Sequence, residues 1–239
     1  WHLMAKIDKT QYTKQEWREI RNQRRIQKVV EKNKKLVETS HRKNKKTAFV
    51  LGNGTSRATI DPADLWPYGK TYGCNALYRS FAPDFLVAVD VKMILEINKS
   101  KYQHTHSVWT NPNKSYSHIK HLNFFSPSKG WSSGPTALWL ASQHGYETIY
   151  ILGFDYKGLK DNTSFNNIYA STMNYKKSTD GPTFYGNWMR QTRSVIQENK
   201  DINYVRIIAS DNYSPDELNT FDNYNEILVE DFTKMFEIL

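Results

Sequence analysis

The chain has little cysteine, no long apolar run and no zinc-like spacing of histidine. Its one cysteine, Cys74, excludes a framework of internal disulfide bonds. No stretch approaches the roughly 18 continuous apolar residues that a membrane-spanning helix needs. The seven histidines and Cys74 do not show the spacing of zinc ligands, so we expect no metal site. These absences favour a soluble, intracellular protein, which we expect in the cytoplasm.

Positive charge is concentrated in the first 46 residues. Of the 33 Lys and Arg, 15 lie there, against 5 of the 24 Asp and Glu, which leaves 18 basic and 19 acidic residues at positions 47–239. Because this segment has no Gly or Pro and is rich in helix formers, we predict a basic helical arm over residues 1–46 and one domain over residues 47–239. Two interpretations of the arm stay open. Its narrow apolar stripe packs on the domain or on a second copy of the chain, or residues 6–46 bind nucleic acid or another polyanion.

From Thr47 onward, short apolar runs alternate with helical patterns. Runs without polar alternation are typical of strands that are buried on both faces of a parallel sheet. We predict strands at 47–51, 70–74, 84–89, 106–110, 148–152 and 204–208, and helices at 91–98, 133–145, 184–199 and 225–239. This order predicts an α/β fold with a Rossmann-like, doubly wound, mainly parallel sheet that has helices on both faces and a ligand crevice at the carboxyl ends of its strands. The polar segment 157–182 is predicted to be a lid or a disordered loop.

A glycine-rich turn follows the first predicted strand directly and consists of Gly52, Asn53, Gly54, Thr55 and Ser56. Glycine lets the backbone approach a ligand closely, and the N–H groups at the next helix start attract a phosphate. The turn is neither a complete G-x-G-x-x-G motif nor a P-loop. A plain strand-to-helix turn therefore stays the alternative to a phosphate site.

Polar residues also follow three other predicted strands, namely Asn75, Asp90, and the pair Asp155 and Tyr156. Because the carboxyl ends of parallel strands lie at one edge of the sheet, these side chains can meet a ligand there. Asn is also a common strand terminator, and Asp is a common helix cap. Ser133 and Gly134 begin the clearest predicted helix, where free N–H groups face an anion or a serine serves only as the cap.

Three stretches, "AFVLGNGTSRATID", "YGCNALY" and "SSGPTALWLASQHGYETIYILGFDY", carry a resemblance to a known family. In order and spacing they resemble the family 42 glycosyltransferases, the bacterial sialyltransferases that use CMP-sialic acid, over roughly residues 47–156. A related archaeal family of pterin pyrophosphokinases shares the Gly-Asn-Gly opening. The chain also resembles tailed-bacteriophage proteins that carry a "morphogenetic" label, which names no chemistry.

The resemblance implies a role for several residues in binding a nucleotide-activated donor. Asn53 and Asn75 would contact the nucleotide and its phosphate, and Asp155 would meet the ribose or the base edge. Ser133 and Gly134 would meet the donor at the helix start. Tyr156 lies one position away from the family tyrosines that steady the leaving phosphate.

The sequence departs from the family where the catalytic base is expected. The sialyltransferases have a Tyr-x-Gly-His stretch, whereas the matching region here reads "FYGNWMRQT", with Asn187 in place of the histidine. Since a general base is worth roughly 10²–10⁴-fold in rate, Asn187 cannot replace His silently. Either another base serves, with Asp90 and Asp180 as candidates, or the acceptor needs none, or the fold binds without catalysis. Arg190 supplies charge to a leaving phosphate or is a solvated helix residue.

We therefore expect a metal-independent, glycosyltransferase-like enzyme that moves a sugar from a nucleotide-sugar donor of the CMP type to an acceptor. No further cofactor is expected. Two alternatives remain: a non-catalytic assembly or nucleic-acid-associated protein, and a pyrophosphokinase-like enzyme that needs ATP and Mg²⁺. A phage source would place the protein in the host cytoplasm, and the arm is compatible with a homo-oligomer.

Overall fold

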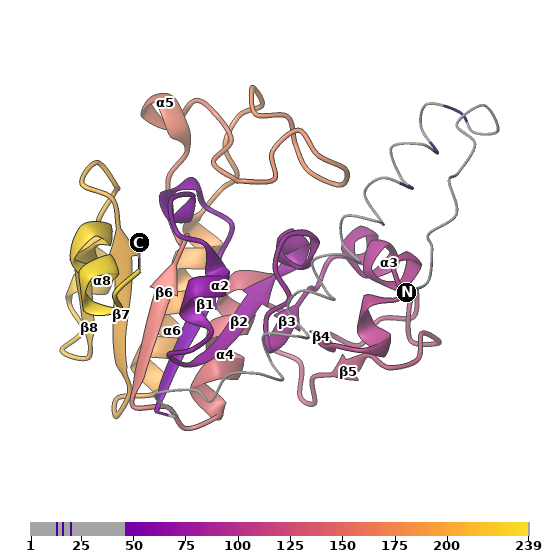
Figure 1. Cartoon of the computed structure of the whole chain (residues 1–239), viewed down its shortest axis with the longest axis horizontal. Helices are drawn as coiled ribbons and strands as arrows, with labels where there is room; N and C mark the ends of the chain where they lie inside the picture. The colour runs from indigo at the N-terminus through magenta and orange to yellow at the C-terminus, as the bar shows by residue number, and fades with distance from the viewer. Residues whose placement is uncertain (1–12, 14–15, 17–19, 21–45, 239) are drawn as a thin grey trace.

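An eight-stranded parallel sheet forms the centre of the molecule (Figure 1). The computed structural model describes Thr13, Glu16, Ile20 and residues 46–238. The order of the strands is β5-β4-β3-β2-β1-β6-β7-β8, and every neighbouring pair is parallel. Their bounds are β1 Thr47–Leu51, β2 Lys70–Cys74, β3 Phe85–Val87, β4 Ser107–Thr110, β5 Asn123–Phe124, β6 Thr148–Leu152, β7 Asn203–Ile208 and β8 Tyr224–Leu228.

The central strand β1 shows why the apolar runs lack polar alternation. All five of its residues are buried, and successive side chains enter opposite faces of the sheet. Phe49 and Leu51 belong to one hydrophobic core, whereas Ala48 and Val50 belong to the other. A strand that is covered on both faces therefore carries mainly apolar residues, without polar alternation.

Helices cover both faces of the sheet (Figure 1). The first core contains side chains of α2 (Pro62–Leu65), η3 (Asn75–Arg79), α3 (Val91–Lys99) and α8 (Val229–Met235). The second core contains side chains of α4 (Ser133–Gln143), α6 (Gly186–Glu198) and α7 (Asp216–Asn219). The short elements η2 (Thr55–Arg57), η4 (Tyr102–His104) and α5 (Leu159–Asn162) lie in connections. The predicted α/β fold with a doubly wound sheet is confirmed.

One predicted helix is wrong in its first third. The segment 225–239 reads as helical, but Tyr224–Leu228 is strand β8, which pairs with β7, and the helix covers only Val229–Met235. Each residue from Tyr224 to Leu228 has a partner in β7, from Tyr204 to Ile208. This pairing is a long-range interaction, so the local periodicity of apolar residues cannot reveal it.

The predicted basic arm, residues 1–46, lies outside the described residues except at Thr13, Glu16, Ile20 and Lys46. Thr13 and Glu16 exchange the hydrogen bonds of a capping box: the Thr13 N–H donates to Glu16 Oε2 over 2.8 Å, and the Glu16 N–H donates to Thr13 Oγ1 over 3.3 Å. In the described part of the chain, no helix combines the length and the apolar composition of a membrane span.

The polar segment after β6 packs against the carboxyl ends of the strands. Figure 1 shows it, with α5, beyond the ends of β1 and β6. The Ile168 N–H donates to the Asn53 carbonyl over 2.8 Å, and Asn166 Oδ1 accepts the Thr55 N–H over 2.9 Å. These contacts hold the segment over the edge of the sheet where the sequence places the ligand crevice.

Candidate functional site

A cavity of about 310 Å³ opens at the point where the strand order reverses. β1 lies between β2 and β6. The connection after β1 runs through α2 on the face of the first core, whereas the connection after β6 runs through α6 on the face of the second core, so the crevice lies at this reversal point. The cavity is lined by residues that follow β1, β2, β3 and β6 and by the first turns of α4 and α6. Nine of the predicted site residues line it: Gly52, Asn53, Gly54, Asn75, Asp90, Ser133, Gly134, Asp155 and Tyr156.

The glycine-rich turn is not the phosphate cradle that its composition suggests. Most of its N–H groups already have protein acceptors: Gly52 donates to the Leu152 carbonyl (2.7 Å) and Gly54 to the Gly153 carbonyl (2.9 Å). Further along, the Thr55 N–H donates to Asn166 and the Ser56 N–H to Asp155. Among the described residues, the Asn53 N–H alone in this turn has no acceptor.

Close contact between two loops explains the glycines of this turn. A Cβ on Gly52 would lie less than 3.0 Å from the Gly153 carbonyl oxygen, and a Cβ on Gly54 would lie less than 3.0 Å from Asp155 Oδ2. The β1 and β6 loops therefore pack backbone to backbone, and glycine is required for that approach.

Asn53 and Asp155 hold the loops together. The Asn53 amide donates to the Cys74 carbonyl over 3.1 Å and to Tyr175 Oη over 3.4 Å. The Asp155 carboxylate accepts from the Ser56 N–H over 3.1 Å, from the Ser56 hydroxyl and from Asn166 Nδ2 over 3.0 Å. Since both side chains are buried and hydrogen-bonded to protein, their main effect is to shape the cavity.

The free donors of the cavity lie at the start of α4 and on Asn75. Ser133 and Gly134 are the first two residues of α4, and their N–H groups have no acceptor among the described residues. The third residue, Pro135, has no N–H. Asn75 Oδ1 accepts the Ser133 hydroxyl over 2.8 Å, which leaves the Asn75 Nδ2 donor without a described partner. A helix N-terminus with free amides attracts an anion.

Aromatic side chains form another part of the cavity wall, namely Trp131, Phe154, Tyr156, Tyr185 and Trp188. The rings of Tyr185 and Trp188 meet edge to face, with 5.2 Å between their centroids. The Tyr156 hydroxyl donates to Thr192 over 2.9 Å, and burial raises the pKa of Tyr156, so this tyrosine stays protonated and committed to the protein. A wall of this kind can stack against a planar base.

Asp90 is the carboxylate of the cavity that has no described partner. It precedes α3 as the N-cap residue, but its side chain makes no capping hydrogen bond. Partial removal from water raises the pKa of Asp90 above its ordinary value of 3.8. A free carboxylate with a raised pKa at a cavity is suited to accept a proton.

Three predicted catalytic residues do not reach the cavity. Asp180 accepts the Lys177 N–H over 2.8 Å within its own exposed turn. Arg190 Nη2 donates to Asn187 Oδ1 over 3.3 Å on the exposed surface of α6. Trp188, which lies between them in the sequence, lines the cavity. The position of Asn187 and Arg190 follows from the helical period, because the residues that face the cavity leave their neighbours on the opposite side. Asp90 is therefore the predicted base that the fold brings to the site.

Sequence reasoning missed the aromatic wall and the loop residue Asn166. Trp131 and Trp188 stand in otherwise polar surroundings in the sequence, which is a signal for a ligand surface, but nothing local ties them to the strand ends.

Cys74 ends β2 and lines the cavity, yet burial raises the pKa of its thiol to about 12, which leaves it without a thiolate at neutral pH.

In the described part of the chain, no three His, Cys, Asp or Glu side chains gather as a metal-binding group would.

Comparisons of the chain with protein-family models, with curated proteins and with solved structures give no match.

Proposed function

We propose that the protein binds a nucleotide-activated sugar of the CMP type in the cavity at the carboxyl ends of β1, β2, β3 and β6 and transfers the sugar to an acceptor hydroxyl. One observation carries this proposal: free backbone donors at the start of α4, the Asn75 amide and an aromatic wall converge on one cavity at the reversal point of the sheet. The backbone and amide donors can bind the phosphate of a nucleotide, and the aromatic side chains can stack against its nucleobase.

The chemistry assigns a separate task to each group. The bond between the anomeric carbon and the phosphate oxygen breaks, and its electron pair stays on the nucleotide phosphate. The N–H groups of Ser133 and Gly134 stabilise the negative charge that develops there. The acceptor oxygen forms the new bond to the anomeric carbon, and its proton passes to the Asp90 carboxylate. This assignment replaces the base that Asn187 cannot supply.

Binding of nucleotides tests the proposal first. The chain is titrated with CMP, UDP, GDP and ATP, with and without Mg²⁺, and the melting temperature is followed. A nucleotide at about 100 times its Kd stabilises the folded state by about 2.7 kcal/mol. We expect CMP to raise the melting temperature without Mg²⁺. A response restricted to ATP with Mg²⁺ would favour the pyrophosphokinase alternative, and CMP binding without hydrolysis of a CMP-sugar would favour the non-catalytic one.

Two matched variants locate the binding site. Asn75→Asp keeps the shape of the side chain and the bond to Ser133 but replaces the free amide donor with a negative charge. Asn187→Asp makes the same change on the outer surface of α6. We expect Asn75→Asp to weaken CMP binding by about tenfold or more, because losing a hydrogen bond to a charged group costs about 1.5–3 kcal/mol. Equal affinity in both variants would contradict the proposed site.

A further inference from the structure

A second cavity, of about 540 Å³, adjoins the first. Asn75 and Asp90 line both cavities, so the two spaces meet at the free carboxylate. The remaining walls come from the start of α3 and from the segment after β6, and they include Lys92, Phe165, Asn174, Tyr175 and Lys176.

We propose that the second cavity binds the acceptor and that the acceptor carries an anionic group, such as a phosphate or a carboxylate, close to the hydroxyl that reacts. This inference rests on the proposed function, because it takes the first cavity as the donor site. It adds the chemical class of the acceptor, which nothing in the donor site specifies.

The charges around the second cavity carry the inference. Lys92 and Lys176 line it, and neither ammonium group has a carboxylate partner among the described residues. Lys176 lies over the ring of Phe165, with its Nζ 5.9 Å from the ring centroid. Among the residues that the structure describes, Asp90 is the one acidic residue that lines this cavity. Two unpaired cations at a cavity attract an anion.

The backbone at the start of α3 adds donors to the same space. The first hydrogen bond of this helix runs from the Ile94 N–H to the Asp90 carbonyl over 3.0 Å. The N–H groups of Val91, Lys92 and Met93 come before it and have no acceptor among the described residues. They therefore reinforce the two lysines in favouring negative charge.

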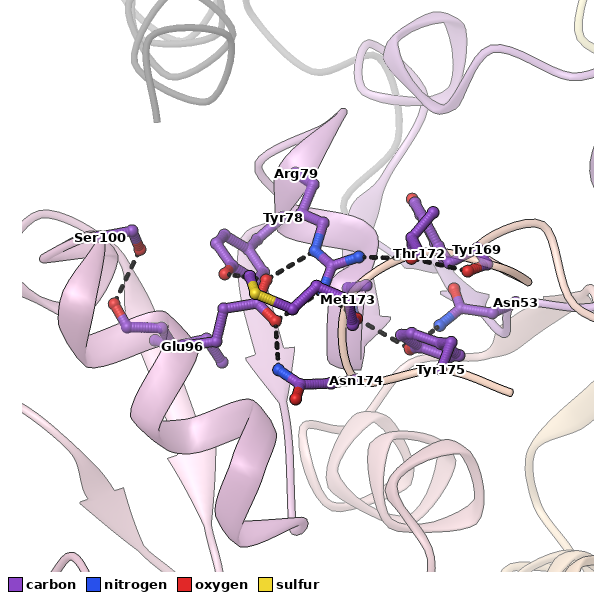
Figure 2. Close-up of polar contacts among 12 residues, drawn as sticks. Asn53, Tyr78, Arg79, Glu96, Ser100, Tyr169, Thr172, Met173, Asn174 and Tyr175 are labelled. Carbon is purple, nitrogen blue, oxygen red and sulfur yellow. Dashed lines mark hydrogen bonds and ion pairs between the residues drawn. The ribbon is translucent and has the colours of Figure 1, made fainter. Parts of the chain in front are cut away.

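A buried ion pair fixes the loop wall of the second cavity (Figure 2). Arg79 donates to both oxygens of Glu96, over 2.6 Å from Nε and 2.5 Å from Nη2. Arg79 also donates to Thr172 Oγ1 and to the Met173 carbonyl, each over 2.8 Å, and Glu96 accepts from Asn174 Nδ2 over 2.7 Å. The pair thus holds residues 172–174 in place.

Tyr175 completes the anchor of the wall. Its hydroxyl accepts from Asn53 Nδ2 over 3.4 Å and from the Ala76 N–H over 3.3 Å, at the ends of β1 and β2 (Figure 2). The wall that presents Lys176 is therefore built by the fold before any ligand binds, and a preformed site loses less entropy on binding.

The shared wall of the two cavities places the reacting groups beside Asp90. An acceptor in the second cavity meets a donor in the first beside Asp90. The acceptor hydroxyl loses its proton to Asp90, its oxygen bonds to the anomeric carbon, and the nucleotide leaves with the electron pair of the broken carbon–oxygen bond.

A pair of double variants tests the inference. Lys92→Gln/Lys176→Gln removes both cavity lysines. The control, Lys101→Gln/Lys177→Gln, removes two exposed lysines that do not line the cavity: Lys101 follows α3, and Lys177 is next to Lys176 in the loop. Isothermal titration then measures the binding of glucose 6-phosphate, glucuronate and neutral glucose to the full chain, with and without saturating CMP.

We expect both anionic probes to bind the unmodified chain more tightly than glucose by about tenfold or more, because ionised partners strengthen hydrogen bonds roughly twofold in energy. The cavity variant should lose this preference, and the control variant should keep it. CMP affinity should stay unchanged in both variants.

Equal binding of anionic and neutral probes would overturn the inference, and so would an equal loss in the two double variants. The nucleotide-free titration separates the two proposals. If CMP does not bind but the anionic probes still bind through Lys92 and Lys176, the proposed donor site fails while the anion site stands.

Discussion

Replacing Glu96 with alanine tests the most connected part of the site. The side chain is 6% exposed and accepts hydrogen bonds from Tyr78, Arg79 and Asn174. Without its carboxylate, Arg79 remains buried with a positive charge and without a counter-charge (Figure 2). The loop that forms the wall of the second cavity loses its anchor at the same time.

The expected cost of Glu96→Ala is large. Removing one partner of a buried ion pair costs about 3–5 kcal/mol, because the other charge stays out of water. For a domain of 150–250 residues each kcal/mol lowers the melting temperature by about 2–4 °C, so the expected fall is roughly 6–20 °C. Domains are stable by about 5–15 kcal/mol, so the variant folds where the unmodified chain is stable by more than about 5 kcal/mol.

Urea unfolding and hydrogen exchange measure the two consequences of Glu96→Ala. Unfolding gives the change in free energy, and exchange at residues 172–176 reports whether the loop opens locally. The control is Glu198→Ala, whose carboxylate is half exposed and pairs with Lys129 over 3.2 Å. An exposed pair of this kind contributes about 0–1 kcal/mol.

The double variant Arg79→Met/Glu96→Leu separates charge burial from loop anchoring. Apolar replacement of a buried ion pair is often neutral or stabilising, so we expect the free energy of unfolding to recover while residues 172–176 exchange faster. A loss below about 1 kcal/mol for Glu96→Ala, equal to that of Glu198→Ala, would refute the reasoning, because an exposed pair has that value.

Two further predictions concern the first cavity. Burial raises the pKa of Asp90 in the folded chain above 3.8, so the ionised form destabilises the fold, and stability falls as pH rises through the raised pKa. At pH 7, Asp90→Asn should therefore have a melting temperature at or above that of the unmodified chain, and below pH 3.8 it should have no advantage. The variant should also lower any transfer rate by roughly 10²–10⁴-fold. A lower melting temperature at pH 7 would contradict the predicted destabilisation by the ionised carboxylate. Gly54→Ala places a Cβ against Asp155 and the Gly153 carbonyl and should cost about 1–3 kcal/mol in urea unfolding, whereas Gly181→Ala, with open space around it, serves as the control; equal values would show that the loops do not pack as closely as described.

Much of the fold can be predicted from the sequence. The strands predicted at 47–51, 70–74 and 148–152 have the observed bounds, because strands that are buried on both faces lack regular polar alternation and each of these runs ends where a Gly or Asn begins the turn. The helix predicted at 133–145 ends two residues earlier than expected, at Gln143. The edge strands β5 and β8 were missed, since a short edge strand depends on its neighbour in the sheet more than on its own composition.

The candidate site was predictable in position but not in function of each residue. Asn53, Asn75, Asp90, Ser133 and Asp155 all line one cavity, as expected for residues at the ends of parallel strands. Which of them is free to meet a ligand depends on partners far away in the chain. Asp155 is occupied by Ser56 and Asn166, whereas Asp90 has no described partner.

The sequence alone determines the local features of the fold: apolar runs specify buried strands, and polar residues mark where those strands end. The availability of each donor and acceptor arises from long-range packing. The glycines after β1 make room for the β6 loop, Arg79 and Glu96 hold the loop beyond it, and the helix period turns Trp188 inward and Arg190 outward. A hydrogen bond between residues 99 or 111 positions apart cannot be recognised in the local sequence. Such bonds occupy Asp155 and the Ser56 and Thr55 N–H groups, whereas Asn75, Asp90 and the start of α4 line the cavity with donors or acceptors that have no described partner.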